Sequence, residues 1–158
     1  MTAPFTLRDA AAEDYPGIRR LFEQLHRQHV ENRPDIYQDA DPLPEEEYKQ
    51  LLQDERSVLL AAFTRKQAVG LCQLTLRPPS KSPLVRPQRA AFIEALVVAE
   101  EYRRQGLGSR LFEQARERAR TLGARRLTLN VWCFNEEAAA FYLRMGMQKQ
   151  RIQMEGTL

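Results

Sequence analysis

Apolar residues along this chain follow two spacings, one typical of helices and one typical of strands. Ile18, Leu21 and Leu25 recur at intervals of three and four residues, which places them on one face of a helix. Residues 57–63 and 67–76 are instead two β-rich runs on either side of a short turn. This second pattern predicts an antiparallel hairpin.

The middle of the chain carries an apolar run, residues 90–98, that only Glu94 interrupts, as is typical of a central strand. A helical pattern follows from Leu107 and ends at Gly123. Further strands are expected at residues 5–8, 125–132 and 147–154, and further helices at residues 45–55 and 135–145. The patterns together predict an α/β (α+β) fold, with one mixed sheet and helices on it, in a single domain spanning residues 1–158.

Composition narrows the class of protein. Of the 158 residues, 43% are apolar and 28% are charged, a balance typical of a soluble globular domain. No apolar run approaches the roughly 20 residues of a membrane span, and the N-terminus lacks the apolar core of a signal peptide. Cys72 and Cys133 lie in strand-like runs and are expected to be small core residues in a reducing compartment. We therefore expect a cytoplasmic protein with no membrane partner.

The net charge of +3 raises the question of nucleic acid, but the distribution of charge argues against it. Arginines alternate with glutamates in residues 112–120, which is typical of a solvated helix face. His26 and His29 have no metal-ligand spacing with another His or Cys, so we expect no metal site. A small anionic ligand needs fewer positive charges and fits this sequence better.

A candidate anion site lies between the central strand and the following helix. Residues 103–108 read RRQGLG, two arginines and two glycines at a helix start. The free N–H groups of a helix N-terminus favour an anion, and glycines let the backbone approach it closely. A nucleotide-triphosphate loop would need Gly-Lys-Ser/Thr here, and a dinucleotide fingerprint would need a third glycine where Leu111 stands. A tight turn without any ligand explains these six residues equally well.

Two linked motifs resolve this alternative. The pattern Arg-x-x-Gly-x-Gly starts at Arg103, inside the segment IEALVVAEEYRRQGLGSRLFEQA. About 30 residues further on, LTLNVWCFNEEAAAFYLRMGM carries Asn135, Ala138, Phe141, Tyr142, Gly146 and Met147 in a second signature. Together they resemble the GNAT superfamily of acetyl-coenzyme A-dependent N-acetyltransferases, most firmly over residues 90–147. The resemblance implies a mostly antiparallel sheet with helices on both faces and a splayed central strand pair.

The resemblance also implies acetyl-coenzyme A as cosubstrate. Its pyrophosphate would lie on the amides of residues 104–109, and its pantetheine would pair like an extra strand with the backbone of residues 96–98. A backbone N–H in that strand would polarise the thioester carbonyl. The implied coenzyme-binding residues are Leu96, Val97, Val98, Arg103, Arg104, Gln105, Gly106, Leu107, Gly108, Ser109 and Asn135.

Acetyl transfer to an amine needs an acid for the leaving sulfur and a base for the amine. Tyr142 is the candidate acid, because a phenol stays protonated at neutral pH; the alternative is an ordinary packing aromatic. Glu94 is the candidate base. Strand alternation places it with Phe92, Leu96 and Val98, where we expect a desolvated carboxylate; the alternative is a carboxylate at the exposed rim.

The sequence leaves the class of the acceptor open. The sequence favours a primary amine of a small molecule, such as a polyamine or an amino acid, over a protein lysine or amino terminus, or a non-catalytic acyl-coenzyme A sensor. Asn130 stands where some amino-terminal acetylating members of the superfamily carry a glutamate, which weakens that reading. Acids between residues 35 and 47 could attract a cationic amine, or they could belong to a solvated loop. A homodimer through exposed sheet edges or the C-terminal strand is compatible with the pattern.

Overall fold

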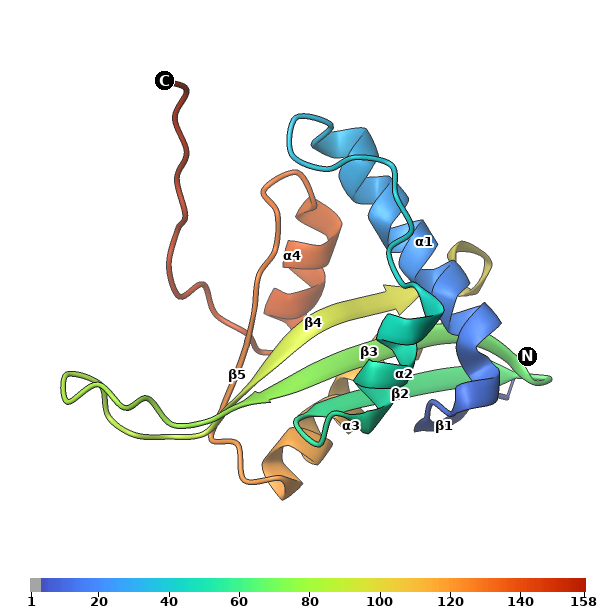
Figure 1. Cartoon of the computed structure of the whole chain (residues 1–158), viewed down its shortest axis with the longest axis horizontal. Coiled ribbons are helices and arrows are strands. Elements are labelled where there is room, and N and C mark those ends of the chain that lie inside the picture. The colour runs from blue at the N-terminus through green and yellow to red at the C-terminus, as the bar shows by residue number, and fades with distance from the viewer. Residues whose placement is uncertain (1–3) are drawn as a thin grey trace.

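The computed structural model describes residues 4–158 and contains one five-stranded sheet (Figure 1). The strands lie side by side in sequence order, and all neighbouring pairs are antiparallel except the last, β4 with β5, which is parallel. They are β1 Thr6–Asp9, β2 Ser57–Thr64, β3 Gln67–Arg77, β4 Ala90–Val98 and β5 Arg126–Leu129. The predicted hairpin, central strand and mixed sheet are confirmed.

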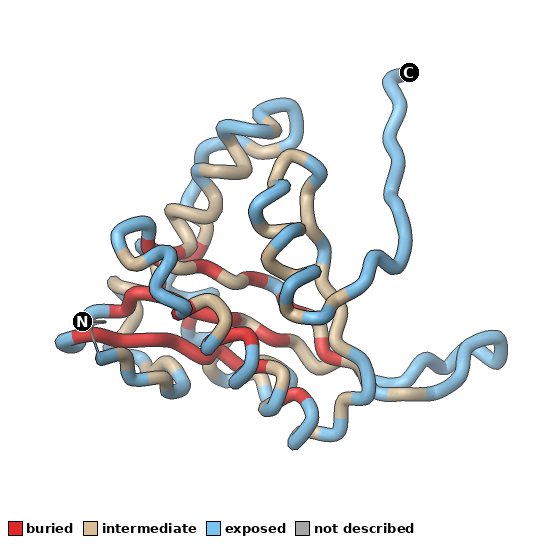
Figure 2. The backbone as a smooth tube through the Cα atoms, turned by 180° about the vertical axis from the view of Figure 1, so that it is seen from behind, coloured by how far each residue is buried: buried red, intermediate tan, exposed pale blue. Residues whose placement is uncertain are grey.

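Helices cover both faces of the sheet, as expected. One face packs against α1 (Tyr15–Asn32) and α2 (Glu45–Gln53), and the other against α3 (Leu107–Thr121) and α4 (Glu136–Arg144). Short 3-10 turns, η1 (Ala12–Asp14) and η2 (Glu100–Tyr102), precede α1 and follow β4. The buried residues concentrate along the strands and the helix sides that meet them (Figure 2). Residues 4–158 contain no helix long and apolar enough to cross a membrane.

The N-terminus of α1 shows how a carboxylate at a capping position can act in the folded chain. Asp14 occupies the capping position, but its carboxylate accepts the N–H of Ala11 at 2.7 Å and pairs with Arg8 at 2.7 Å. This pairing with the Arg8 guanidinium lowers the pKa of the Asp14 carboxyl. Asp14 thus joins α1 to β1, while Ile18 and Leu21 bury the predicted apolar face of the helix.

Two predictions about the C-terminal half are wrong. The expected strand at residues 125–132 ends at Leu129, so Cys133 lies exposed in a turn, whereas Cys72 is buried as expected. The expected strand at residues 147–154 is not formed. Residues 148–158, the C-terminal arm, are extended and exposed throughout (Figures 1 and 2). Apart from the ion pair of Glu155 with Arg33, they stand away from the rest of the chain. A strand needs a neighbour to take up its backbone hydrogen bonds, and alternation of side chains alone does not provide one.

Candidate active site

A gap opens in the sheet where β4 continues and β5 ends. The two strands pair only from Ala90 with Arg126 to Ile93 with Leu129, and β4 runs on to Val98 without β5. At this point the register of β4 against β3 shifts by one residue, so that Glu94 is the extra residue of a β-bulge. Because a bulge bends and twists its strand, it directs β4 away from β5. The splayed strand pair implied by the resemblance is confirmed.

The backbone of β4 presents hydrogen-bonding groups to this gap. The N–H of Ala99 donates to the carbonyl of Val69 on β3 at 2.8 Å. Since alternate residues of an antiparallel strand face alternate neighbours, Val97 also pairs with β3, and the N–H and C=O groups of Leu96 and Val98 face the gap. Of the three predicted coenzyme-contacting residues in β4, two therefore offer free edge groups, and the backbone of Val97 is already paired.

One edge group of β4 is taken by side chains of this chain. The carbonyl of Val98 accepts from Nε2 of Gln24 at 2.9 Å and from Nε of Arg103 at 3.4 Å. Oε1 of Gln24 also accepts the N–H of Glu100 at 3.3 Å, so this residue joins α1 to the end of β4. Sequence reasoning missed Gln24, because a single polar residue beside an apolar helix stripe carries no signal of a long-range contact.

The turn after β4 carries the predicted anion site. Arg103, Arg104 and Gln105 are exposed, and Arg104 (φ +62°) and Gly106 (φ +77°) adopt left-handed backbone conformations. Among the described residues, no atom lies within 4 Å of a β-carbon placed on Gly106, so the turn is open.

Buried Leu107 anchors the start of α3 beneath this turn. The first bond of the helix runs from the N–H of Arg110 to the carbonyl of Gly106, at 3.2 Å. The N–H groups of residues 107–109 therefore have no partner within α3, and they form the positive end of the helix dipole. This end of the helix lies beside two exposed arginines, as an anion requires.

Tyr142 lies on the α4 side of the gap. Its ring packs against Phe141 and Phe112, with centroids 5.2 and 5.9 Å away. Burial raises the pKa of its phenol, and the neighbouring thiol of Cys72 raises it further. Tyr142 packs against the same core cluster as Leu96 and Val98, the two residues of β4 that face the gap. Phe141 packs edge-on against Phe112 at 6.1 Å, which is a structural role.

Glu94 does not occupy the environment predicted for it. The bulge breaks the alternation of β4, so Ala91 and Ile93 share a core layer with Leu96 and Val98, and Glu94 does not join that layer. Its side chain is exposed rather than desolvated. The sequence pattern could not reveal this change, because an extra residue in one strand becomes visible only against its neighbour's register. Glu94 does lie at the residue where the gap begins.

Asn135, one of the implied coenzyme-binding residues, performs a structural task. Its Oδ1 accepts the N–H of Ala138 at 3.1 Å and caps α4. Asn135 thereby fixes the start of the short helix that carries Tyr142.

A cluster of four rings, here called the aromatic bridge, connects α1 and the loop after it to the segment after β5. His29 stacks on Tyr37 with centroids 4.9 Å apart, and Nε1 of Trp132 donates to the Tyr37 hydroxyl at 3.2 Å. Trp132 in turn stacks with Phe134 at 6.0 Å. Burial lowers the pKa of His29, so its imidazole is neutral at neutral pH. Sequence analysis considered His29 only as a metal ligand and missed the bridge.

The acids between residues 35 and 47 are less available to a cationic ligand than their number suggests. Asp35 pairs with Arg33 at 2.8 Å, and Asp41 pairs with Arg19 at 3.3 Å. Arg33 lowers the pKa of Asp35. The pKa of Asp41 is lowered mostly by the hydrogen bond from the N–H of Leu43, and Arg19 lowers it further. These two acids thus stabilise the loop between α1 and α2 rather than form a free negative patch.

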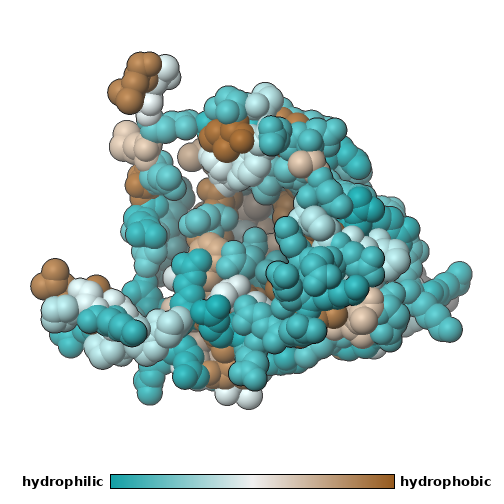
Figure 3. Space-filling model, viewed as in Figure 1, coloured by the Kyte–Doolittle hydropathy of each residue, from teal (hydrophilic) through white to brown (hydrophobic). Residues whose placement is uncertain are grey.

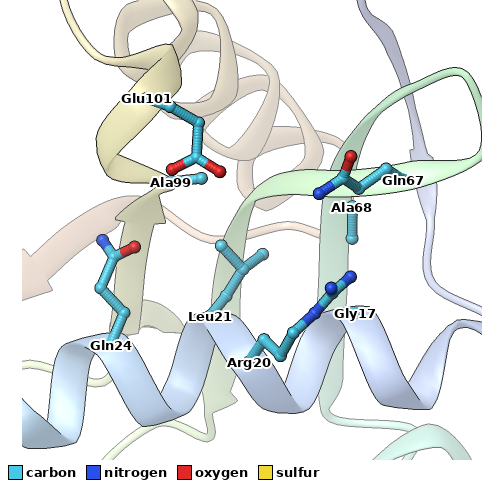
Figure 4. Close-up of a pocket in the computed structure, with 8 residues that line it drawn as sticks. All are labelled: Gly17, Arg20, Leu21, Gln24, Gln67, Ala68, Ala99 and Glu101. Carbon is cyan, nitrogen blue, oxygen red and sulfur yellow. The ribbon is translucent and has the colours of Figure 1, made fainter.

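The surface is hollowed in the upper part of the face seen in Figure 1, between α1 and the segment after β5, and apolar atoms lie at the floor of this hollow (Figure 3). A different hollow of about 100 Å³ lies between α1 and the ends of β3 and β4, lined by Arg20, Gln24, Gln67 and Glu101 (Figure 4). Ligand pockets usually measure about 300–1,000 Å³, and neither Tyr142 nor Glu94 lines this smaller hollow. This hollow therefore belongs to the packing of α1 rather than to the gap.

Residues 4–158 contain no cluster of side chains able to hold a metal ion.

Comparison with known proteins gives consistent results over nearly the whole chain. The sequence model of the acetyltransferase (GNAT) family matches residues 18–147. The uncharacterised N-acetyltransferase YdgE of Bacillus subtilis is 30% identical, over 98% of this chain and 98% of that protein. A crystallised tetramutant of the BH1408 protein from Bacillus halodurans is 29% identical, with a TM-score of 0.91 over 97% of this chain and 99% of that one. Glucosamine-6-phosphate N-acetyltransferase from Arabidopsis thaliana shares the fold alone, with a TM-score of 0.74, 18% identity and 98% of each chain covered.

Proposed function

This chain belongs to the acetyltransferase (GNAT) family and is an N-acetyltransferase, and from that premise we propose that it moves the acetyl group of acetyl-coenzyme A directly to a primary amine of a small molecule. Small molecules of this kind include polyamines, amino acids and related amines. The observation that carries the proposal is the gap between β4 and β5, which Leu96 and Val98 face and whose core cluster the Tyr142 ring joins.

The residues of the gap fit the coenzyme in two places. The N–H and C=O groups of Leu96 and the N–H of Val98 suit the amide groups of an extended pantetheine, which would lie where β5 is absent. The amides of residues 107–109, with Arg103 and Arg104 beside them, suit a pyrophosphate. Gln105 would contribute its backbone to the same turn. Asn135 acts on this site through α4, since its side-chain oxygen is the cap of that helix.

Coenzyme A supplies an acetyl thioester, and the side chains of this chain supply the proton transfers. The amine nitrogen bonds to the acetyl carbon, the carbon–sulfur bond breaks, and the sulfur leaves with the electron pair. Tyr142 donates its proton to that sulfur, since burial keeps the phenol protonated. Glu94 takes the proton from the amine through water, which its exposure allows. An N–H of Leu96 or Val98 stabilises the oxyanion.

A small acceptor is favoured over a polypeptide by the aromatic bridge. The bridge ties the loop after α1 to the segment after β5, through the Tyr37–Trp132 hydrogen bond. These segments flank the hollow between α1 and the C-terminal half (Figure 3). A polypeptide acceptor needs an open groove, whereas a small amine can enter a hollow closed at one side.

An acceptor screen that detects the released thiol tests the proposal. Acetyl-coenzyme A is mixed with polyamines, amino acids and amino sugars in one panel, and with lysine and amino-terminal peptides in another. Thiol release with the small amines and none with the peptides is expected. Thiol release with the peptides alone would show that the acceptor is a polypeptide and not a small amine. Tight coenzyme binding by calorimetry without turnover on either panel would instead indicate a sensor.

A further inference from the structure

The helix that carries Tyr142 is held differently at its two ends. α4 has nine residues and none of them is fully buried, and so short a helix is marginal without tertiary support. Asn135 caps its first turn. After its last turn the chain leaves the helix through Gly146, in a left-handed conformation (φ +90°). The last turn therefore needs a contact from another element if Tyr142, near the end of α4, is to keep one position.

That contact comes from Arg116 on α3. Nη2 of its guanidinium donates to the carbonyl of Met145, the residue at the C-terminal end of α4. A cation is favoured there because the last carbonyl groups of a helix carry partial negative charge. The same guanidinium lies over the ring of Phe112, with Cζ 4.6 Å from the ring centroid. Arg116 thus contacts both the end of α4 and the ring against which Tyr142 packs.

The backbone of α3 gives this arginine a fixed base. Leu111, Phe112 and Ala115, which precede it in the helix, are fully buried. The side chain of Arg116 is 31% exposed, and its ion-pair partner is Glu113, 3.7 Å away and one turn earlier in α3. A partly exposed pair within one helix contributes little to stability. The contacts with α4 are therefore the ones through which Arg116 joins two separate elements.

We propose that Arg116 is a positioning residue for the reaction: it holds the C-terminal end of α4 and the Phe112 ring, and so sets the place of the Tyr142 phenol in the gap. The inference rests on the proposed function, in which this phenol donates a proton to the departing sulfur. Arg116 acts through Tyr142 and takes no part in the proton transfer. A misplacement of about 1 Å in a reacting group can cost about 100-fold in rate, so the loss of this support should reach kcat.

Substitutions of Arg116 test this role in steady-state kinetics. Arg116→Met keeps an unbranched apolar side chain and removes the guanidinium, and it should lower kcat about 10–100-fold. KM for acetyl-coenzyme A should stay within about twofold, because the β4 wall is untouched. Arg116→Lys keeps the charge and should recover part of the loss. The matched control is Arg120→Met, one turn further along α3, where the arginine pairs with Glu117 and should be dispensable for kcat.

A double-mutant cycle separates positioning from general stability. In a Tyr142→Phe background, Arg116→Met should change kcat less than about twofold, since the group that it positions is gone. An equal loss in both backgrounds would show that Arg116 acts independently of the phenol, and the proposal would then be wrong.

Ultraviolet titration of the same four proteins follows the phenol without any turnover. Subtracting each Tyr142→Phe protein from its parent isolates the ionisation of this one tyrosine. Burial raises the pKa of Tyr142 above its ordinary value of 10, and Arg116→Met should bring it back towards 10, because a displaced phenol is better solvated. An unchanged titration would overturn the positioning role, whatever the kinetics show. A lowered pKa together with full activity of Tyr142→Phe would support the positioning role and reject only the proposed acid.

Discussion

The two walls of the gap differ in how firmly the rest of the chain holds them. The β4 wall is paired along its whole length with β3 and backed by α3, whose Leu107, Leu111 and Phe112 are fully or almost fully buried. The α4 wall consists of a short strand and a nine-residue helix, neither with a fully buried residue. It is held by the ring contacts of Phe141 and Tyr142 with Phe112, and by a bond from Arg116 to the carbonyl of Met145.

This difference fits the division of tasks in the proposed function. In that proposal the β4 wall offers backbone groups, whose positions must be constant for a long coenzyme to bind along them. The α4 wall would offer one side chain, Tyr142, whose phenol would approach the sulfur of the coenzyme. A less buried wall can adjust its position at smaller cost, since fewer apolar contacts are lost. Substitutions on the two walls should therefore affect different kinetic constants.

The largest effect is expected on the α4 wall. Tyr142→Phe should lower kcat by about 10²–10⁴-fold with little change in KM, because it removes only the proton donor. Because burial raises the pKa of this phenol above its ordinary value of 10, wild-type kcat should show no alkaline decline near pH 10. Tyr102→Phe is the matched control, and it should keep full activity. Steady-state kinetics against pH measure both, and an unchanged kcat would remove Tyr142 from the mechanism.

A smaller loss of kcat is expected at Glu94, where the two walls of the gap separate. Glu94→Gln should reduce kcat by about 10²-fold, the low end for a general base, because an exposed carboxylate acting through water is partly replaceable by solvent. The amide keeps the size of the side chain, and the melting temperature should stay constant. Glu101→Gln, another exposed carboxylate near the end of β4, serves as control. Equal rates for wild type and Glu94→Gln would exclude the base role.

A substitution in the turn after β4 should change KM rather than kcat. Gly106→Ala forces an L-residue into a left-handed conformation, at a cost of about 1–2 kcal/mol, and should raise KM for acetyl-coenzyme A about tenfold. Gly146→Ala is matched to it, because Gly146 is also left-handed and open. That control should lose similar stability in urea unfolding and keep its KM. Parallel changes of KM in both variants would show that stability alone is being measured.

The smallest effect is expected at the contact between α1 and the β4 wall. Gln24→Ala removes the hydrogen bonds to Val98 and Glu100, each worth about 0.5–1.5 kcal/mol. KM for acetyl-coenzyme A should rise a few-fold while kcat is kept. Gln28→Ala, one turn further along α1, is the control. If kcat falls and KM does not, Gln24 acts on the reaction rather than on the position of β4.

The order of elements was predictable because each depends on local spacing. The stripe of α1 from Ile18, the β-rich runs of β2 and β3 and the short helix after Asn135 all express local patterns that tertiary contacts reinforce. The turn at residues 103–108 was predictable for the same reason, since Gly106 and the start of α3 are adjacent in sequence. The wrong predictions lie where alternation needed a partner. Residues 130–132 and 147–154 alternate like strands, but within residues 4–158 neither segment pairs with a neighbouring strand.

By itself the sequence determined the family and predicted the turn as the coenzyme site and Tyr142 as the acid, because these rest on residues close together along the chain. Only the tertiary structure decided the environment of Glu94, the orientation of Leu96 and Val98 toward the gap, and the aromatic bridge. The register of β4 against β3, and the closing of the loop after α1 onto Trp132, join residues far apart in sequence. Such contacts follow from the packing of whole elements, and the spacing within one element does not encode them.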